Sequence, residues 1–453
     1  MTLARDLGPS RSTLGDALAV YLKPRVLVVL FLGFSSGLPL ALSGSTLLVW
    51  MRELGVDLGT IGLFALVGTP YAIKFLWAPL IDALDAPLFS RLLGRRRGWL
   101  LLSQLTLMAT IVLLGFSDPA ESPATVAICA LLVAAASSTQ DIVIDAFRVE
   151  SLEPNEQAAG MASYVAAYRV GMLVSTAGAL YLVSGFEFWG LAKSAAWTAG
   201  YVAMAGFVAI GIAATFFAAE PEKSAAAERE HSGKTAFQRV LLTVLGAFSD
   251  FFLREGILVA AVVLAFVVLF KLTDAFSGIM IAPFVIDLGF SRNEYATIIK
   301  GVGLAATLLG GFAGGFVARK YPLAPSLWMS GILQATANLG FSWQAAIGHD
   351  LAWLTISITL ENFTSAVGTV IFVAYLSALC RNPLHTAMQY ALLTALAAVG
   401  RTFLSAKAGG IAQATGWVWF FVICAMLALP SLLLLVWLQR RGHFKQLEGA
   451  REQ

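Results

Sequence analysis

Charged side chains occur inside long apolar stretches of this sequence, where they could bind an ion or a polar solute. Four cations lie deep in such stretches, at Arg169, Lys271, Lys300 and Arg401. A lone charge in the interior of a membrane costs about 2.5–3.5 kcal/mol, so these groups should be paired or should face a water-filled cavity. Ammonium and guanidinium groups in such a cavity would bind carboxylates, and arginine can do so through two parallel hydrogen bonds.

Carboxylates accompany these cations. Asp274 follows Lys271 by three residues, and the two share a helix face. Two interpretations stay open for this pair: an ion pair that only neutralises itself, or a cation that binds a solute. Glu361 has no charged neighbour within one helical turn. It is therefore the best candidate for carrying a proton, and the alternative is a structural ion pair with Arg169 or Arg401.

The composition indicates the class of protein that holds these charges. The chain has 453 residues, of which 58% are hydrophobic and 13% are charged, and its mean hydropathy is +0.79. Soluble domains carry about 25% charged residues, and apolar runs of about 20 residues are long enough to cross a bilayer. The sequence thus predicts an all-α polytopic membrane protein. Soluble enzymes, secreted disulfide scaffolds, nucleic-acid modules and outer-membrane barrels are excluded. Without a CxxC motif, a Cys/His cluster or a Walker motif, we expect no metal, no cofactor and no direct use of ATP.

Hydropathy predicts twelve membrane spans, grouped six and six around a long central segment. The spans are expected at about 25–50, 58–81, 98–117, 123–147, 157–184, 194–218, 257–285, 294–318, 323–346, 351–379, 384–410 and 415–438. This division predicts an N-terminal segment 1–24, a first bundle 25–218, a central loop 219–256, a second bundle 257–438 and a tail 439–453. Within the central loop, the half-apolar stretch 237–252 is expected to form a helix on the membrane surface.

The distribution of lysine and arginine predicts the orientation of the chain. The loops on one side hold only Arg52, Lys193 and Arg292, whereas the other side is rich in basic residues. Because cytoplasmic loops carry the excess of positive charge, both termini are expected in the cytoplasm.

The two halves repeat one another weakly. Leu54-Gly55-Val56 follows the first span as Leu288-Gly289-Phe290 follows the seventh. Phe34-Ser35-Ser36-Gly37 precedes Pro39 much as Phe276-Ser277-Gly278 precedes Pro283. Parallel repeats of this kind are typical of transporters built from two bundles.

Several segments in both halves resemble one family, the AmpG-type muropeptide permeases of the major facilitator superfamily, which is related to the acetyl-coenzyme A transporters. The resemblance covers about residues 20–440. Its segments are Gly33-Phe34-Ser35-Ser36-Gly37-Leu38-Pro39, Lys74-Phe75-Leu76-Trp77-Ala78-Pro79, Gly94-Arg95-Arg96-Arg97-Gly98-Trp99, Gln140-Asp141-Ile142-Val143-Ile144-Asp145, Tyr168-Arg169-Val170-Gly171, Lys271-Leu272-Thr273-Asp274, Glu361-Asn362 and Gly400-Arg401.

The resemblance implies a fold and an activity. The fold would be two six-helix bundles around a central cavity, working by alternating access. The activity would be proton-driven import of anhydromuropeptides, which are N-acetylglucosaminyl-anhydro-N-acetylmuramyl peptides, across a bacterial inner membrane. Such import feeds peptidoglycan recycling and, in some hosts, the induction of β-lactamase and antibiotic resistance. The partners would be the muropeptide, protons and membrane lipids, with no nucleic acid, and the protein is expected to be a monomer.

The resemblance also suggests roles for particular residues. The four deep cations would receive the carboxylates of the cargo, at Arg169, Lys271, Lys300 and Arg401. Amide side chains would bind sugar amides and aromatic rings would stack on sugar faces, at Gln140, Asn362, Gln389, Phe34, Tyr164 and Tyr168, with Asp141 beside them. Proton coupling would rest on Glu361, with Asp141 and Asp274 as further candidates. The loop after the second span would latch one conformation, through Asp82 with Arg95, Arg96 and Arg97.

Two alternatives to this function stay open. The chain could carry another bulky anion, such as a coenzyme A ester. It could also be an intramembrane enzyme acting on lipid-linked sugars, but the sequence shows neither a nucleophile nor a metal constellation for that chemistry. We therefore expect a carrier that is not an enzyme.

Overall fold

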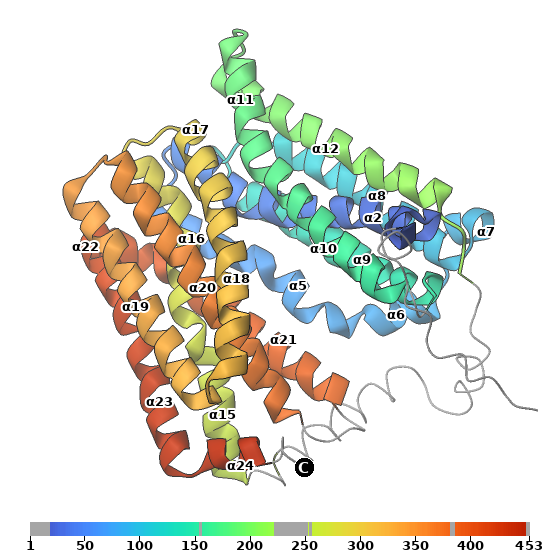
Figure 1. The fold of residues 1–453 in the computed structure, drawn as a ribbon. Helices are drawn as coiled ribbons and strands as arrows, with labels where there is room; N and C mark the ends of the chain where they lie inside the picture. The colour runs from blue at the N-terminus through green and yellow to red at the C-terminus, as the bar shows by residue number, and fades with distance from the viewer. Residues whose placement is uncertain (1–18, 154–155, 222–251, 253–255, 381–385, 450–453) are drawn as a thin grey trace, which may run out of the picture.

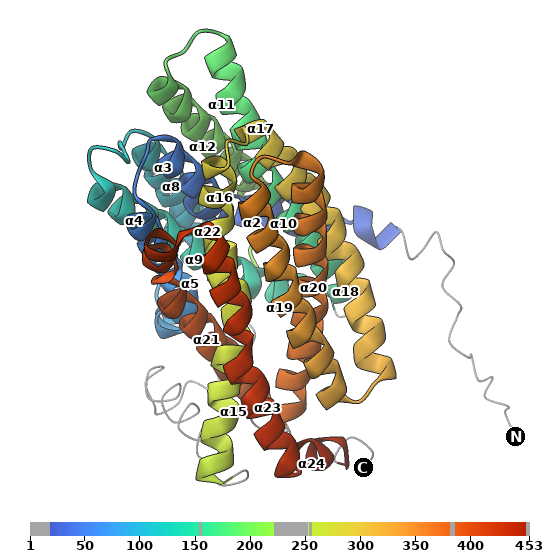
Figure 2. The ribbon, with the colours of Figure 1, turned by 90° about the vertical axis from the view of Figure 1, so that its left-hand side faces the viewer.

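The computed structural model describes the chain outside residues 1–18, 154–155, 222–251, 253–255, 381–385 and 450–453. In the part that is described, the regular structure is helical and contains no β-strand. Figure 1 and Figure 2 show two helical bundles, one from each half of the sequence, that meet near α11, α16 and α17 and diverge away from that region.

The first bundle contains six long helical stretches among the described residues, and several of them are interrupted. In chain order they are α2 (Pro24–Ala41) with α3 (Leu47–Glu53); α4 (Leu58–Leu63), α5 (Thr69–Ile73) and α6 (Ala78–Ala83); α8 (Arg95–Gly115); α9 (Pro123–Ser151); α10 (Gln157–Leu173) with α11 (Ala179–Phe188); and α12 (Lys193–Phe217). A short helix, α7 (Phe89–Leu93), joins the second stretch to the third.

The second bundle repeats this plan. Its stretches are α15 (Ile257–Phe270) with α16 (Leu272–Asp287); α17 (Arg292–Tyr295) with α18 (Gly303–Lys320); α19 (Leu323–Ile347); α20 (Leu351–Leu379); α21 (Thr386–Ser405); and α22 (Ala408–Met426) with α23 (Ala428–Arg440). A last short helix, α24 (His443–Gly449), follows in the predicted tail and buries His443, Phe444 and Leu447.

The predicted membrane fold is confirmed. Ten stretches among the described residues are long and apolar enough to cross a membrane. The second bundle contains two further helices, α19 and α21. The boundary between the last two spans lies where the sequence places it, because Gly416, with φ 73° and ψ 166°, breaks α22 into two helices. Within the predicted eleventh span, a turn separates Ser405 at the end of α21 from Ala408 at the start of α22, and Lys407 in this turn is exposed. The surface helix expected at 237–252 falls almost entirely outside the described residues.

Glycines allow α2 and α10 to pack with their backbones in contact. A Cβ atom at Gly37 would stand 2.1 Å from the carbonyl oxygen of Tyr168, and one at Gly171 would stand 2.3 Å from that of Phe34. A Cβ at Gly33 would meet the backbone of Tyr164 at 2.6 Å. Small residues are the usual means of close helix packing in membranes. This contact fixes the two tyrosines relative to α2.

The sequence repeat corresponds to a repeat in structure. Gly55 and Gly289 each lie two residues after the end of a helix and have positive φ, at 81° and 83°, a conformation that glycine adopts without steric cost. In each loop the amide of this glycine bonds to the carbonyl three residues before it. Two residues later, Asp57 and Ser291 each cap the next helix with a side-chain oxygen. The loops after the first and seventh spans are therefore equivalent.

Candidate functional site

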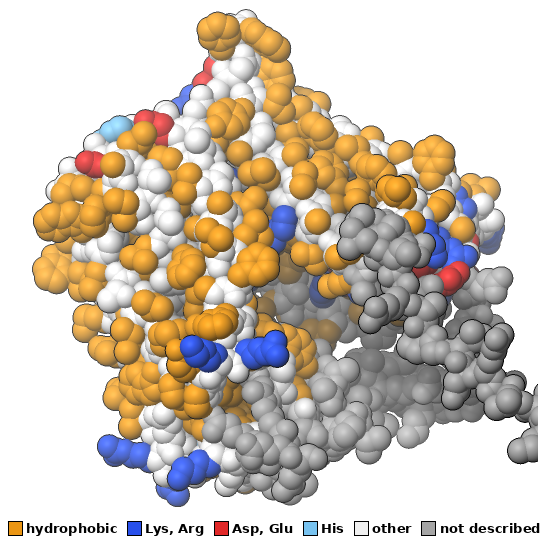
Figure 3. Space-filling view, in the orientation of Figure 1, with side chains coloured by type: hydrophobic (Ala, Val, Ile, Leu, Met, Phe, Trp, Pro, Cys, Tyr) orange, Lys and Arg blue, Asp and Glu red, His pale blue; other side chains and the backbone are white. Residues whose placement is uncertain are grey.

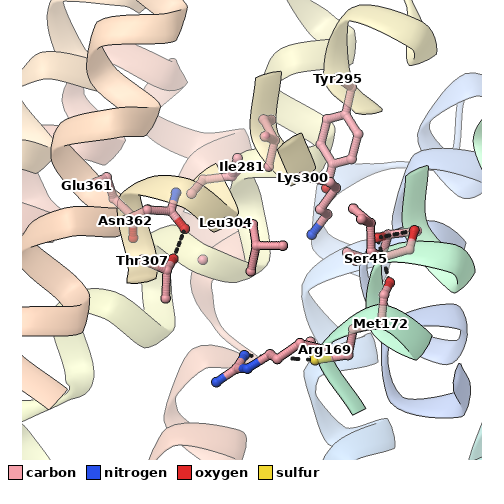
Figure 4. Close-up of a pocket in the computed structure, with 14 residues that line it drawn as sticks. Ser45, Arg169, Met172, Ile281, Tyr295, Lys300, Leu304, Thr307, Glu361 and Asn362 are labelled. Carbon is pink, nitrogen blue, oxygen red and sulfur yellow. Dashed lines mark hydrogen bonds between the residues drawn. The ribbon is translucent and has the colours of Figure 1, made fainter. Parts of the chain in front are cut away.

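A cavity of about 270 Å³ lies between the two bundles and is lined by both. The first bundle contributes Ser45, Arg169 and Met172, and the second contributes residues of α16, α17, α18 and α20. In Figure 4, Glu361, Asn362 and Thr307 form one wall, Arg169 and Met172 lie opposite, and Lys300 points into the space from above. Figure 3 shows the recess between the bundles with basic side chains in it. The interface between the halves is therefore the candidate site.

Local breaks in the helices position two of the cations. Lys271 lies between the end of α15 and the start of α16, with φ −94° and ψ 5°. Lys300 belongs to a π-helical stretch, Ala296–Val302, and such stretches occur often at functional sites. Its ammonium group stands 5.8 Å from the centre of the Tyr295 ring.

A second cavity, of about 450 Å³, lies within the second bundle and shares Glu361 with the first. It also contains Lys271, Asp274 and Arg401. Lys271 Nζ donates to Asp274 Oδ2 at 2.6 Å and to Thr369 Oγ1 at 2.9 Å. The ion pair predicted from their spacing is therefore present, and it faces the cavity that Glu361 borders.

Hydroxyl and amide groups surround the carboxylate of Asp274. Ser365 Oγ donates to it at 2.9 Å and Gln334 Nε2 at 3.2 Å. Sequence reasoning missed both residues. The sequence does indicate one wall of this cavity, because Glu361, Ser365 and Thr369 are spaced by four residues and therefore share a face of α20.

Glu361 lies between cations without being paired. Among the described residues it forms no ion pair within 4.0 Å and no side-chain hydrogen bond, and the same holds for Arg401. Arg169 makes only a weak contact from Nη1 to the sulfur of Met172, at 4.0 Å. The structural ion pair considered for Glu361 with Arg169 or Arg401 is thus not formed in this conformation.

Asp141 lies in a separate polar cluster inside the first bundle. Ser36 Oγ donates to Asp141 Oδ1 at 2.5 Å, and the hydroxyls of Ser36 and Tyr164 are 2.9 Å apart. The ring of Tyr168 stacks at an angle against Tyr164, with centroids 6.1 Å apart. Lys74 is one of the charges close enough to act on Asp141. None of these residues lines the cavities described above.

Four of the expected binding residues, Gln140, Phe34, Gln389 and Asn362, lie in different surroundings. Gln140 is fully buried, and neither atom of its amide has a partner among the described residues. In this conformation Gln140 lines neither cavity, and its role in binding cargo stays a prediction. Phe34 packs edge-on against Phe207. Gln389 is buried in α21, whereas Asn362 lines the first cavity and accepts from Thr307 at 3.2 Å.

The arginines of the predicted latch bind neighbouring helices of their own bundle. Arg96 is 4% exposed and donates to both oxygens of Glu150 at the end of α9, at 2.9 and 2.5 Å. Arg95 stands 3.6 Å from the same carboxylate. Arg97 donates to two carbonyls at the end of α12, at 3.0 Å each. The side chain of Asp82 lies outside the described residues.

One end of the cavity is closed by polar contacts between the bundles. Arg52 of the first bundle pairs with Asp287 of the second, and Arg292 of the second pairs with Glu53 and Glu187 of the first. Trp417 Nε1 also donates to Asp287, at 3.0 Å. These are the loops that hold few basic residues, which the charge distribution assigns to the outer side. Sequence reasoning did not predict this network, since its partners lie more than 100 residues apart.

Comparison with known proteins places the chain in a family. Residues 29–383 match the Major Facilitator Superfamily. The chain is 38% identical over 420 residues to the anhydromuropeptide permease of Escherichia coli K12, covering 92% of this chain and 80% of the relative. It is 35% identical to a putative transporter AmpG 4 of Rickettsia felis, covering 92% and 97%.

Solved structures share the fold at low identity. A POT family transporter in complex with a thioalcohol-conjugated peptide matches with a TM-score of 0.65 and 12% identity, over 92% of this chain and 96% of that one. The xylose transporter XylE from E. coli, in a partially occluded inward-open conformation, matches with a TM-score of 0.60 and 12% identity, over 93% and 97%. At this identity the two transporters establish the fold of the chain. The chain is a multi-pass membrane protein that belongs to the AmpG-type muropeptide permeases of the major facilitator superfamily.

Proposed function

We propose that this protein imports anhydromuropeptides across the inner membrane of a bacterium, driven by the proton gradient. The first support is the family, whose E. coli member is named for anhydromuropeptides. The second is the site, which is lined by both bundles and therefore suits a solute released by their relative movement.

The observation that carries the proposal is the excess of unpaired cations at the cavities. Arg169, Lys300 and Arg401 line them without a carboxylate partner among the described residues, and Lys271 is paired with Asp274. A muropeptide carries several carboxylates, and these would supply the missing partners. Its amides and hydroxyls suit Asn362, Thr307 and the hydroxyls of α20.

Glu361 is the proposed proton carrier. It borders both cavities, so a change in its charge alters its electrostatic interaction with cargo in either cavity. When it is ionised it attracts the neighbouring cations, and when it is protonated it leaves them available to the cargo. Asp274 already accepts hydrogen bonds from three donors, and Asp141 lines neither cavity. They are therefore weaker candidates.

The conformation is proposed to be open toward the cytoplasm. The basic end of the first bundle includes Arg95, Arg96 and Arg97 at the start of α8. In Figure 1 this end, marked by α6 and α7, lies apart from the second bundle. The opposite ends are joined by the ion pairs of Arg52 and Arg292. With the basic side in the cytoplasm, the closed end is periplasmic and both termini are cytoplasmic. The latch arginines would then hold α8, α9 and α12 together as one moving body.

Uptake by sealed vesicles tests this function. Purified protein in liposomes should accumulate labelled anhydromuropeptide when the pH is lower outside, and a protonophore should abolish the accumulation. Arg169→Gln should raise the half-saturating concentration about tenfold or more, since a hydrogen bond to a charged group contributes about 1.5–3 kcal/mol. Arg91→Gln, which removes an exposed charge away from the cavities, is the matched control. If the vesicles take up coenzyme A esters and not the muropeptide, the proposed cargo is wrong. If the cargo is chemically altered during uptake, the protein is not a simple carrier.

A further inference from the structure

A third cavity lies between the bundles where α10 faces α18, and its chemistry differs from that of the other two. It has a volume of about 930 Å³. Its inner wall shares Arg169, Thr307 and Asn362 with the first cavity and Ser365 and Thr369 with the second. The remaining walls are apolar, formed mainly by Ala162, Val165, Ala166, Leu308, Gly311 and Phe312. The diverging pair α10 and α18 is visible in Figure 1.

The glycines of α18 show that this groove is open rather than packed. Gly310 and Gly314 face α20, where an added Cβ would stand 2.3 Å from the backbone of Phe363 and 2.9 Å from that of Val367. Gly311, the next residue, has nothing within 4 Å of the position of a Cβ. One face of α18 is thus closely packed, and the neighbouring face is left without a partner in the protein.

The groove is continuous with the outer surface of the membrane-spanning helices. Phe312 is 80% exposed, Leu308 54% and Val165 43%. In a membrane, such side chains are in contact with hydrocarbon. Water in an apolar groove of this kind would be unfavourable, so the surrounding lipid is the occupant that matches its surface.

A basic pair stands at the end of α18, where a lipid headgroup would lie. Arg319 and Lys320 are exposed, and the ammonium group of Lys320 covers the Phe316 ring at 5.3 Å. The ten residues from Arg319 back to Leu309 span about 15 Å of helix, which is half of a hydrocarbon core of about 30 Å. An acyl chain whose headgroup rests on this pair therefore reaches the level of Leu308 and Phe312.

We propose that the groove between α10 and α18 binds one acyl chain of an anionic phospholipid, whose headgroup is held by Arg319 and Lys320. The chain fills the groove while the bundles are apart on this side and must leave before α10 and α18 can approach. Neither the muropeptide nor a proton gradient is needed to occupy the groove, although its inner wall includes Arg169 and Asn362 of the proposed cargo site.

Photo-crosslinking in nanodiscs tests the proposal. Phosphatidylglycerol with a diazirine near the end of one acyl chain is the probe, and peptides are mapped by mass spectrometry. Adducts are expected on Val165, Leu308 and Phe312. Gly311→Leu should fill the groove and lower these adducts at least fivefold, while adducts on Leu309, which is 65% exposed outside the groove, stay unchanged. Gly206→Leu is the control, because Gly206 also has open space around it but lies in α12.

Two further variants keep the proposal open to refutation. Ala166→Leu fills the groove from the opposite helix and should act as Gly311→Leu does, which covers the case in which either variant fails to insert. Replacing Arg319 and Lys320 by Gln should reduce the preference for phosphatidylglycerol over phosphatidylcholine by about tenfold. Groove adducts that persist in both leucine variants, or groove residues that are oxidised by hydroxyl radicals instead of labelled by lipid, would overturn the assignment.

Discussion

Arg292 and Glu53 form a two-point ion pair between the two halves of the molecule, with Nε to Oε1 at 2.8 Å and Nη2 to Oε2 at 2.5 Å. Both side chains are largely buried, at 8% and 10% exposed. Glu53 ends the helix before Leu54-Gly55, as Asp287 ends the helix before Leu288-Gly289, and Asp287 pairs with Arg52. The equivalent carboxylates of the two repeats therefore each accept an arginine from the opposite half.

Removing Arg292 should open this end of the cavity. Breaking one partner of a buried ion pair costs about 3–5 kcal/mol, and every 1.4 kcal/mol changes an equilibrium tenfold. A cysteine at position 45, in a chain whose native cysteines are replaced, should react more than tenfold faster with an impermeant thiol reagent from outside when Arg292→Gln is added. Adding Glu53→Gln as well should reverse much of this effect. Unchanged reactivity would show that the pair does not hold the closed end.

Gly409 should be essential for closing this end of the cavity, whereas the neighbouring Gly410 should not be. A Cβ at Gly409 of α22 would stand 1.8 Å from the carbonyl oxygen of Leu58 in α4, whereas Gly410 has nothing within 4 Å. Gly409→Ala should therefore prevent the two bundles from meeting and stop uptake, while Gly410→Ala transports normally. Transport and protein amount in the membrane are measured side by side. Normal transport by Gly409→Ala would contradict the closeness of this contact.

Much of this architecture could be predicted from the sequence because membrane spans depend on local composition. The apolar runs, the parallel repeat and the deep charges are all readable residue by residue. The pairing of Lys271 with Asp274 also follows from spacing along one helix. Contacts such as Arg292 with Glu53 depend on how two bundles meet, and nothing in either local sequence specifies the partner.

Gln140 shows what the sequence of a single helix leaves undecided. The small residues at 134–138 are compatible both with a wall of a cavity and with close helix packing. The choice depends on which helix lies opposite, and the structure buries this face of α9 completely at Gln140.

Glu361→Gln should uncouple transport from the proton gradient. A neutral amide cannot release a proton, so the variant should lose gradient-driven accumulation of muropeptide. The cations that bind cargo remain, so exchange of labelled for unlabelled cargo across the membrane should stay measurable. Glu121→Gln, in an exposed loop, is the control. Normal accumulation by Glu361→Gln would show that Glu361 does not carry the proton and would make Asp141 the next candidate.

The contact between Lys23 and Glu156 should stabilise the first bundle only above acidic pH. Lys23 Nζ donates to Glu156 Oε1 at 2.8 Å, and this hydrogen bond lowers the pKa of Glu156 below its ordinary value of 4.5. A lowered pKa in the folded state adds stability that is present above the unfolded pKa and is lost as the pH falls through the folded one. Lys23→Gln should therefore lower the melting temperature at pH 7 and leave it unchanged near pH 3. An equal loss at both pH values would contradict this origin.

The pair formed by Lys271 and Asp274 should distinguish a structural cation from one that binds cargo. Lys271→Ala leaves Asp274 in the membrane interior with only the neutral donors Ser365 and Gln334, so stability should fall by about 3 kcal/mol, at the lower end of the cost of breaking a buried pair. The double variant Lys271→Ala with Asp274→Ala removes the uncompensated charge and should restore insertion and melting temperature.

If Lys271 only neutralised Asp274, the double variant would also transport. We expect it to insert and remain inactive, because Lys271 lies in the cavity shared with Glu361 and reaches Thr369 on α20 as well as Asp274. Binding of labelled muropeptide to the purified double variant, measured beside uptake, locates the defect. Weakened binding assigns Lys271 to the cargo, whereas full binding together with full uptake would reduce it to a counter-ion of Asp274.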